Sequence, residues 1–495
     1  MPALEQLVAL KNVFGSDPEQ RVAKLLERLA STRVRDPEKL ILLHETVLFL
    51  RAYPHGARVL RLADKLLFAF ERRLQGVDPW PFEAGEVSGI VGTALSTNYS
   101  HAFAKFLSAR HGKKVKVDWD SYAHADRLGP VLARLAPLAL EDWSVEPHID
   151  WRRWFEALQG DVAWLVENLD PATYDSLELV LWWTIDAAAS RTFARLPRSE
   201  VFYHKEPLLK RRDVSLEAEL ASKKIPVRRL SQAEANRVLD VIISTNAVRY
   251  RELWGFSFPD AKHVYHADFG RGLDLYWFGV PPTARLPLRA YHGGAFFKNG
   301  VPLGYIETLS FFDRMEVGFN LYYTFRDGES AWLYARFLKF CQQQCGVTCF
   351  SIDPYQIGHE NEEGIESGAF WFYRKLGFRS ASDEIQKLVE KEEKKLAERP
   401  GYRTPPAMLR RLAKAPVLYG STLDDWKSFS LRTFAQKIGR GEAWPAIVSR
   451  VRSETSAEEI VRAKNATEEV GYLRLLQRSP QLRKGILRLG QPAKA

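Results

Sequence analysis

A short polar loop in the middle of the chain has the composition of an anion-binding turn. It occupies residues 325–330 and precedes a predicted helix, 331–344, whose first backbone N–H groups have no partner within the helix. Those groups and the helix dipole attract phosphate, and small residues at 328, 330 and 331 let a phosphate approach the main chain. The loop therefore predicts a pyrophosphate site, with an ordinary solvent-exposed helix start as the alternative.

Three carboxylates stand at positions where a general base could act. Glu307, Glu316 and Asp353 lie on or at the ends of predicted strands. Each could take a proton from a substrate group, directly or through water. A solvated residue at a strand edge is the alternative for each of them, because strand geometry alone does not define a site.

The elements that position these residues alternate between strand and helix. The pattern predicts, in order, a strand at 225–230, a helix at 232–244, a long connection, a hairpin at 294–310, a strand at 315–323, a helix at 331–344, a strand at 347–352 and a helix at 364–376. The strand–helix–strand unit at 315–352 should have parallel strands.

Local signals define several starts and turns. Ser231 and Glu234 form a capping box before the helix at 232–244. Asn-Gly at 299–300 accepts positive φ at both turn positions of a hairpin. Near the N-terminus, Asp-Pro-Glu occurs twice, and Asp17 and Asp36 are expected to be the N-caps of the helices that follow.

The helix that ends near Gly377 carries a more specific pattern. Residues 369–378 read Ala-Phe-Trp-Phe-Tyr-Arg-Lys-Leu-Gly-Phe. They resemble the Ala-x-x-Phe-Tyr-x-Lys-x-Gly-Phe helix end of the GNAT N-acetyltransferase superfamily, and the element order agrees. Gly328 and Ser330 take the family's small loop positions, whereas Phe325 replaces its usual polar or basic residue. The resemblance covers residues 225–378, under a third of the chain.

This resemblance implies a mixed α/β sheet that binds acetyl-CoA or another acyl-CoA. The strands 315–323 and 347–352 would part, with the pantetheine arm between them and a backbone N–H stabilising the oxyanion. The implied cofactor contacts are Asn320, Leu321, Tyr322, Tyr323, Phe325, Arg326, Gly328, Glu329, Ser330, Ala331 and Asn361. Tyr373 would protonate the departing thiolate; its alternative role is that of a core aromatic beside Phe370 and Phe372.

The fold class expected is α+β, with a central domain flanked by mainly α-helical regions. We expect a helical domain at 1–195, a linker at 196–224, the GNAT-like domain at 225–422 with a helical insertion after 382, and a basic helical region at 423–495. Helices expected in the first domain include 58–74, 101–110, 151–158 and 176–193. Residues 381–495 carry +9 of the net charge of +10, which can steer CoA or nucleic acid; a solvated helical surface is the alternative.

Composition favours a cytoplasmic protein. Cys341, Cys345 and Cys349 are expected to be buried free thiols, because no His or fourth Cys stands nearby at zinc-ligand spacing. The sequence has no uninterrupted apolar run of membrane-spanning length. Its first residues lack the basic and apolar regions of a secretory signal.

Two functions from different classes follow. The first is an acyl-CoA-dependent N-acyltransferase acting on a small-molecule or peptide amine. The second is a non-catalytic GNAT-like module in a protein-interaction or nucleic-acid-associated protein. No recognised nucleic-acid-binding motif accompanies the basic C-terminal residues.

Overall fold

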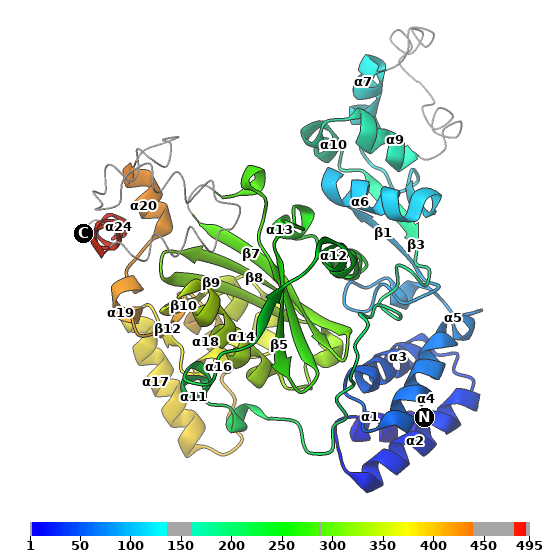
Figure 1. Cartoon of the computed structure of the whole chain (residues 1–495), viewed down its shortest axis with the longest axis horizontal. Helices are drawn as coiled ribbons and strands as arrows, with labels where there is room; N and C mark the ends of the chain where they lie inside the picture. The colour runs from blue at the N-terminus through cyan, green and yellow to red at the C-terminus, as the bar shows by residue number, and fades with distance from the viewer. Residues whose placement is uncertain (1, 136–160, 287–288, 439–479, 492–495) are drawn as a thin grey trace. The chain divides into compact units, whose positions relative to one another are not determined.

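The computed structural model describes residues 2–135, 161–286, 289–438 and 480–491. The chain forms two compact units, each mixing helices and strands (Figure 1). Unit 1 comprises Met1–Pro207, Asn236–Phe258 and Lys298–Pro302, and unit 2 comprises Leu208–Ala235, Pro259–Phe297 and Leu303–Ala495. The expected helix at 151–158 and much of the basic region at 423–495 lie outside the described residues.

Unit 1 begins with a group of amphipathic helices. They are α1 (Pro2–Leu10), α2 (Ser16–Ser31), α3 (Pro37–Ala52), α4 (Ala57–Phe68) and the short α5 (Phe70–Arg73). Asp36 caps α3 as predicted, accepting a hydrogen bond from Lys39 N at 3.2 Å. The prediction that Asp17 caps α2 is wrong: α2 begins at Ser16, and its N-cap is Gly15, which has no side chain to offer.

A small antiparallel sheet follows in unit 1. Its order is β1-β3-β2, formed by β1 (Ala94–Asn98), β2 (Val115–Val117) and β3 (Val180–Thr184). The helices around it are α6 (His101–His111), α7 (Ala125–Leu135), α9 (Asp161–Asn168) and α10 (Pro171–Leu177). The predicted helix at 176–193 is wrong, because β3 occupies its centre. Burial there alternates, with Trp183 buried and its neighbour Trp182 partly exposed, which is the period of a strand.

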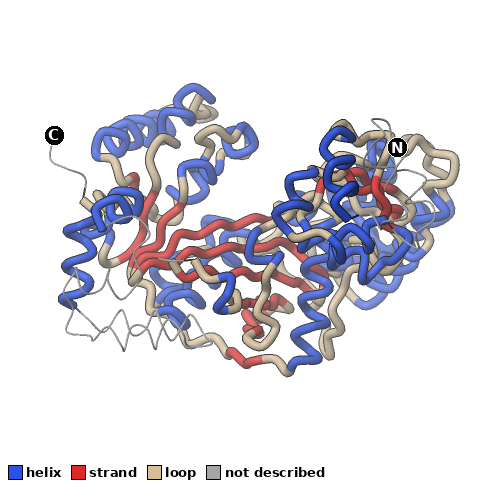
Figure 2. The backbone as a smooth tube through the Cα atoms, turned by 90° about the horizontal axis from the view of Figure 1, so that it is seen from above, coloured by secondary structure: helices blue, strands red, loops and turns tan. Residues whose placement is uncertain are grey.

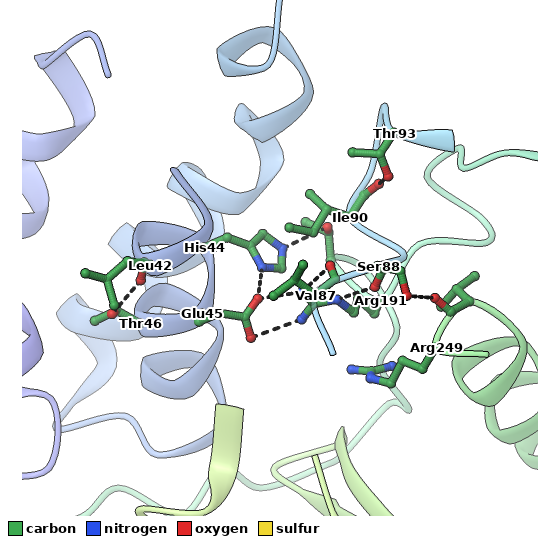
Figure 3. Close-up of polar contacts among 12 residues, drawn as sticks. Leu42, His44, Glu45, Thr46, Val87, Ser88, Ile90, Thr93, Arg191 and Arg249 are labelled. Atoms are coloured by element: carbon green, nitrogen blue, oxygen red, sulfur yellow. Dashed lines mark hydrogen bonds and ion pairs between the residues drawn. The ribbon is translucent and has the colours of Figure 1, made fainter. Parts of the chain in front are cut away.

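A fully buried ion pair joins distant segments of unit 1 (Figure 3). Arg191 donates to both carboxylate oxygens of Glu45 on α3, at 2.5 and 3.1 Å, and to the carbonyls of Ser88 and Val87, each at 2.8 Å. His44 contacts Glu45 through Nδ1 at 3.0 Å, and its Nε2 lies 2.9 Å from the hydroxyl of Thr192. Every charged group in this cluster therefore has a partner.

Unit 2 is built on a nine-stranded mixed sheet of order β11-β12-β10-β9-β8-β7-β6-β5-β4, whose strands run side by side in Figure 2. The strands are β4 (Val227–Arg229), β5 (Val264–Gly270), β6 (Leu273–Phe278), β7 (Ala290–Lys298), β8 (Val301–Phe311), β9 (Arg314–Leu321), β10 (Cys349–Ile352), β11 (Arg379–Ser380) and β12 (Val417–Gly420). β9 and β10 are parallel, as predicted. β12 lies between β10 and β11 and is antiparallel to both.

Two hairpins of this sheet had different sequence signals. The β7–β8 turn is at Asn299 and Gly300, with φ of 50° and 79°, as the Asn-Gly pair predicts. β5 and β6 form a hairpin inside the segment predicted as a long connection. Its turn lacks Asn-Gly; instead Arg271, at φ 52°, lies between Gly270 and Gly272.

Helices cover the sheet of unit 2. They are α11 (Leu216–Leu220), α14 (Ser330–Cys345), α15 (Glu362–Glu366), α16 (Ala369–Arg374), α17 (Asp383–Glu398), α18 (Pro406–Leu412), α19 (Leu423–Trp426), α20 (Leu431–Ile438) and α24 (Pro480–Gly490). The capping box of Ser231 and Glu234 precedes α12 (Gln232–Ala247), which continues into unit 1, followed there by α13 (Trp254–Ser257). α14 packs on the sheet through Tyr334, whose ring centroid lies 4.9 Å from that of Phe319 on β9.

The last described helix is anchored to the sheet. Arg483 of α24 donates to both oxygens of Asp313, in the turn between β8 and β9, at 3.0 Å each. Ser430 N donates to Gly490 O at 2.9 Å. A Cβ added to Gly490 would lie 2.0 Å from a ring atom of Phe429, so this contact requires glycine.

Candidate active site in unit 2

The two parallel strands at the centre of the sheet separate after a short ladder. β9 and β10 pair only at Arg314–Cys349, Met315–Phe350 and Glu316–Ser351. β10 ends at Ile352, whereas β9 continues beside β8 as far as Leu321. The second half of β9 therefore has a strand on one side only.

The backbone of β9 offers hydrogen-bonding groups on its open side. Tyr322 N donates to Leu303 O of β8 at 2.9 Å, so the main-chain groups of Tyr322 and Asn320 point toward β8. By the alternation of a strand, those of Leu321 and Phe319 point the other way, toward the space that β10 has left. The Leu321 carbonyl is reached there by Arg326 Nε at 3.4 Å.

A cavity of about 310 Å³ occupies this separation. The sequence-predicted residues that line it are Asn320, Leu321, Arg326, Ser330, Asn361 and Tyr373. The other lining residues are Phe319, Gln356, Glu363, Gly364, Ser367, Ala369 and Phe372. Residues from β9, the start of α14, and α15 and α16 thus meet around one space.

Tyr373 of α16 lies on the wall of this cavity and is almost entirely buried. Its ring packs edge-on against Tyr334 at 5.5 Å and against Phe378 at 5.8 Å. Burial raises the pKa of the Tyr373 phenol well above its usual value, so the hydroxyl stays protonated. No residue in the described part of the chain hydrogen-bonds that hydroxyl, which leaves its proton available to a molecule in the cavity.

The start of α14 lines the cavity, but only part of the predicted phosphate-binding loop, residues 325–330, does so. Ser330 is the first helical residue and lines the cavity. Phe325 is buried in the core, and its carbonyl accepts from Gly328 N at 2.9 Å. Glu329, the N-cap residue, is buried; its carboxylate accepts from Arg271 Nη2 at 2.6 Å and from Leu209 N at 3.2 Å. Its negative charge is therefore neutralised beside the helix start.

Other predicted contacts have structural partners or lie elsewhere. Arg326 forms an ion pair with Glu363 of α15, so both side chains are paired along the cavity wall. Asn361 caps α15 by accepting from Gly364 N at 3.2 Å, and its Nδ2 donates to Tyr355 O at 2.9 Å. The cavity lining does not include Tyr322, Tyr323, Gly328, Glu329, Phe325 and Ala331.

The three candidate bases differ in environment. Glu307 on β8 accepts from the Tyr291 hydroxyl at 2.6 Å; burial raises its pKa, and this hydrogen bond opposes the rise. Burial also raises the pKa of Glu316, against the opposing effect of Arg289, whose Nη1 lies 3.7 Å from its carboxylate. Asp353 is exposed and caps a short 3₁₀ turn by accepting from Tyr355 N at 2.8 Å.

No family model, curated protein or solved structure matches this chain. The candidate site is therefore defined by its own geometry. The described residues contain no cluster of three or more His, Cys, Asp or Glu side chains arranged to hold a metal ion. No helix among them is long and apolar enough to span a membrane. The three cysteines are buried thiols outside any disulfide bond, as predicted.

Sequence reasoning missed several residues that line the cavity. Gln356 and Glu363 come from the segment after β10, a region predicted only as a polar loop. The signal that could have located them was the position of this segment, since residues that follow a parallel strand lie at its carboxyl end, where ligands bind in α/β sheets. Their side chains alone gave no indication of this role.

Proposed function

We propose that unit 2 transfers an acyl group from an acyl-CoA to an amine. The observation that carries the proposal is the 310 Å³ cavity where β9 and β10 separate, with the Tyr373 hydroxyl on its wall. The resemblance of residues 369–378 to the GNAT helix end supports the same function. Two independent features, a local sequence pattern and a gap in the sheet, thus point to one chemistry.

The cavity offers complementary groups to the pantetheine and the pyrophosphate of CoA. The pantetheine arm contains two amides, which can pair with the outward main-chain groups of Phe319 and Leu321 as a strand would. The pyrophosphate would lie at the amides of α14 that begin at Ser330. Arg326 would leave its ion pair with Glu363 and bind a phosphate oxygen there instead.

The reaction needs one base, one oxyanion donor and one acid. Glu307 takes a proton from the amine, whose nitrogen forms a bond to the thioester carbonyl carbon. A main-chain N–H on the open side of β9 stabilises the tetrahedral oxyanion. When the C–S bond breaks, Tyr373 gives its proton to the thiolate, so the products are an amide and CoA thiol. The thiolate leaves into the same buried space, which also raises its affinity for a proton.

Register places Glu307 within reach of the cavity. Glu307 pairs with Gly318 of β9, two residues before Asn320. A Cβ on Gly318 would lie 3.8 Å from the Glu307 Cβ and 3.9 Å from Gln356 Nε2, and Gln356 lines the cavity. We therefore favour Glu307 over the exposed Asp353 as the base.

Acetyl-CoA binding is the first test. Saturating acetyl-CoA should raise the unfolding temperature by several degrees, because a ligand that binds only the folded state stabilises it. ATP, which shares the adenine nucleotide but lacks pantetheine, is the matched control. Absence of any shift with acetyl-CoA would contradict the proposal, and a shift without CoA thiol release for any amine would favour the non-catalytic module.

Tyr373→Phe tests the acid directly. Loss of the proton donor should lower turnover about 100-fold or more, with acetyl-CoA affinity and unfolding temperature nearly unchanged, because the hydroxyl has no partner to lose. Tyr334→Phe is the control: the Tyr334 hydroxyl is also buried without a hydrogen bond but is absent from the cavity lining. Equal turnover in both variants would remove Tyr373 from the mechanism.

A further inference from the structure

A second cavity is lined by residues of β8 and β9, the strands that carry the proposed base Glu307 and the open edge of the acyl-transfer site. Its volume is about 160 Å³, similar to core cavities that hold a benzene-sized molecule. It is lined by two arginines, Arg289 and Arg314, and by Glu316, with apolar walls that include Leu309, Phe311 and Phe429. Nothing in the acyl-transfer mechanism uses these arginines.

One face of β9 contributes residues to both cavities. The β8–β9 register pairs Leu309 with Glu316, Glu307 with Gly318 and Tyr305 with Asn320, so these residues share a face. Glu316 lines the second cavity and Asn320 the first. Four residues of strand separate them by about 13 Å. The proposed base, Glu307, lies between the two.

The second cavity has an excess of positive charge. Arg289 is within 3.7 Å of Glu316, and this pair is neutral overall. Arg314 forms no ion pair within the described residues; its Nε donates to Ser351 Oγ at 3.2 Å and its Nη1 to Phe429 O at 3.4 Å. Burial lowers the pKa of Arg314, which reflects a cation held away from water. One guanidinium is left to balance one negative charge.

The apolar walls of the second cavity strengthen an ion pair formed inside it. Phe311 stacks on Phe429, with ring centroids 5.5 Å apart and planes inclined by 30°. Apolar walls exclude water, and an ion pair is stronger where water is excluded. A guanidinium binds a carboxylate through two parallel hydrogen bonds. A doubly charged phosphate suits the cavity less, because Glu316 would repel it.

We infer that the second cavity binds a carboxylate of the acceptor, so that the substrate is an amine carrying a carboxylate several bonds away, as in an amino acid acylated on its side-chain amine. This inference rests on the proposed acyl transfer. Glu307, the proposed base, pairs with Gly318, which is two strand residues, about 7 Å, from Glu316. A flexible chain that covers this distance must therefore join the amine to the carboxylate. Arg314 is the main anion ligand, and Arg289 with Glu316 completes the wall.

The test compares acceptors that differ only in charge. Acetyl-CoA and the full-length protein are incubated with 6-aminohexanoate or with 6-aminohexanamide, and CoA thiol release gives kcat/KM for each. The carboxylate should be preferred about tenfold or more, as expected for a charge-assisted hydrogen bond. Calorimetric titration with each compound alone measures binding without CoA.

Variants assign the preference to the cavity. Arg314→Met should reduce the preference to about one, mainly through a higher KM for the carboxylate. Arg289→Met, at a partly exposed position, should show the same direction and guards against misfolding of the first variant. Arg432→Met, which removes an exposed charge of α20 outside the cavity lining, should keep the preference.

The outcomes separate the two proposals. Equal rates with the two acceptors, or a preference that survives both Arg314→Met and Arg289→Met, would overturn the carboxylate site while acyl transfer stands. Carboxylate binding that requires Arg314, in a protein that neither binds nor consumes acetyl-CoA, would overturn acyl transfer and with it the assignment of the ligand as an acceptor. Preference in the wild type that both cavity variants lose supports the inference.

Discussion

Unit 1 and unit 2 both bury arginines, but they balance the charge differently. In unit 1, Arg191 is 2% exposed, and its guanidinium bonds to both oxygens of Glu45 and to two carbonyls. In unit 2, Arg314 has one hydroxyl and one distant carbonyl as partners and lines the second cavity. A fully paired charge holds segments together, whereas an incompletely paired one remains able to bind a ligand.

We expect the largest effect on the free energy of unfolding when the Arg191–Glu45 pair of unit 1 is broken. Glu45→Ala leaves Arg191 buried without a carboxylate, which should lower the free energy of unfolding by about 3–5 kcal/mol. Denaturant unfolding measures the change. Glu27→Ala, which breaks the exposed pair with Arg58, is the control and should cost about 1 kcal/mol or less. Similar losses in the two variants would show that the buried network does not stabilise unit 1.

Acid should weaken the same network in two steps. Burial lowers the pKa of His44 to about 4, so between pH 6.5 and 4 the unfolded state takes up a proton that the folded state refuses. Burial pushes the pKa of Glu45 up, but Arg191 and His44 bring it well below its usual value. Stability should therefore fall as the pH drops below about 6.5 and fall more steeply below about 4.5.

Thermal unfolding measured from pH 8 to pH 4 tests this prediction against a matched variant. His44→Gln removes the titrating ring, which contacts Glu45 and Thr192 and lies in the field of the Arg191 and Arg51 charges. The variant should lose part of the decline between pH 6.5 and 4.5. Burial also lowers the pKa values of His111 and His55 in the same unit and of His292 in unit 2, and these residues should supply the remainder. An unchanged profile in His44→Gln would contradict the assignment.

We expect the smallest effect on the free energy of unfolding when Arg314 of unit 2 is replaced. Arg314→Met removes a cation that has no ion pair within the described residues, so the free energy of unfolding should change by about 1 kcal/mol or less. The same denaturant experiment measures it. A loss as large as that of Glu45→Ala would mean that Arg314 supports the fold rather than a ligand, and the contrast between the units would disappear.

The parts predicted from sequence are those set by local chemistry. Asn299-Gly300 specifies its turn, Ser231 and Glu234 specify a helix start, and the central strand–helix–strand unit follows from its periodicity. β3 was missed because its apolar run is as long as a helix and its period was not distinguished from one. The β5–β6 hairpin was missed because an arginine, not Asn-Gly, occupies its turn.

The site was only partly predictable for a different reason. Tyr373 and Ser330 could be located because a local pattern marks them, and the cavity includes both. The second cavity could not be foreseen, because Arg289 and Phe429 are far apart in sequence and only the folded chain brings them together. The partners of Glu45 and Glu329 were invisible for the same reason, since Arg191 and Arg271 are distant from them along the chain.

The anchored last helix has a consequence for the order in which the molecule is completed. Every strand of the large sheet precedes residue 421. Phe429, which lines the second cavity, packs against Gly490 of α24. The same helix is attached to the sheet by the ion pair of Arg483 with Asp313. Chains fold from the N-terminus as they leave the ribosome. The sheet and the first cavity, proposed here for the acyl donor, can therefore form during translation, whereas the second cavity is completed only after α24 has emerged.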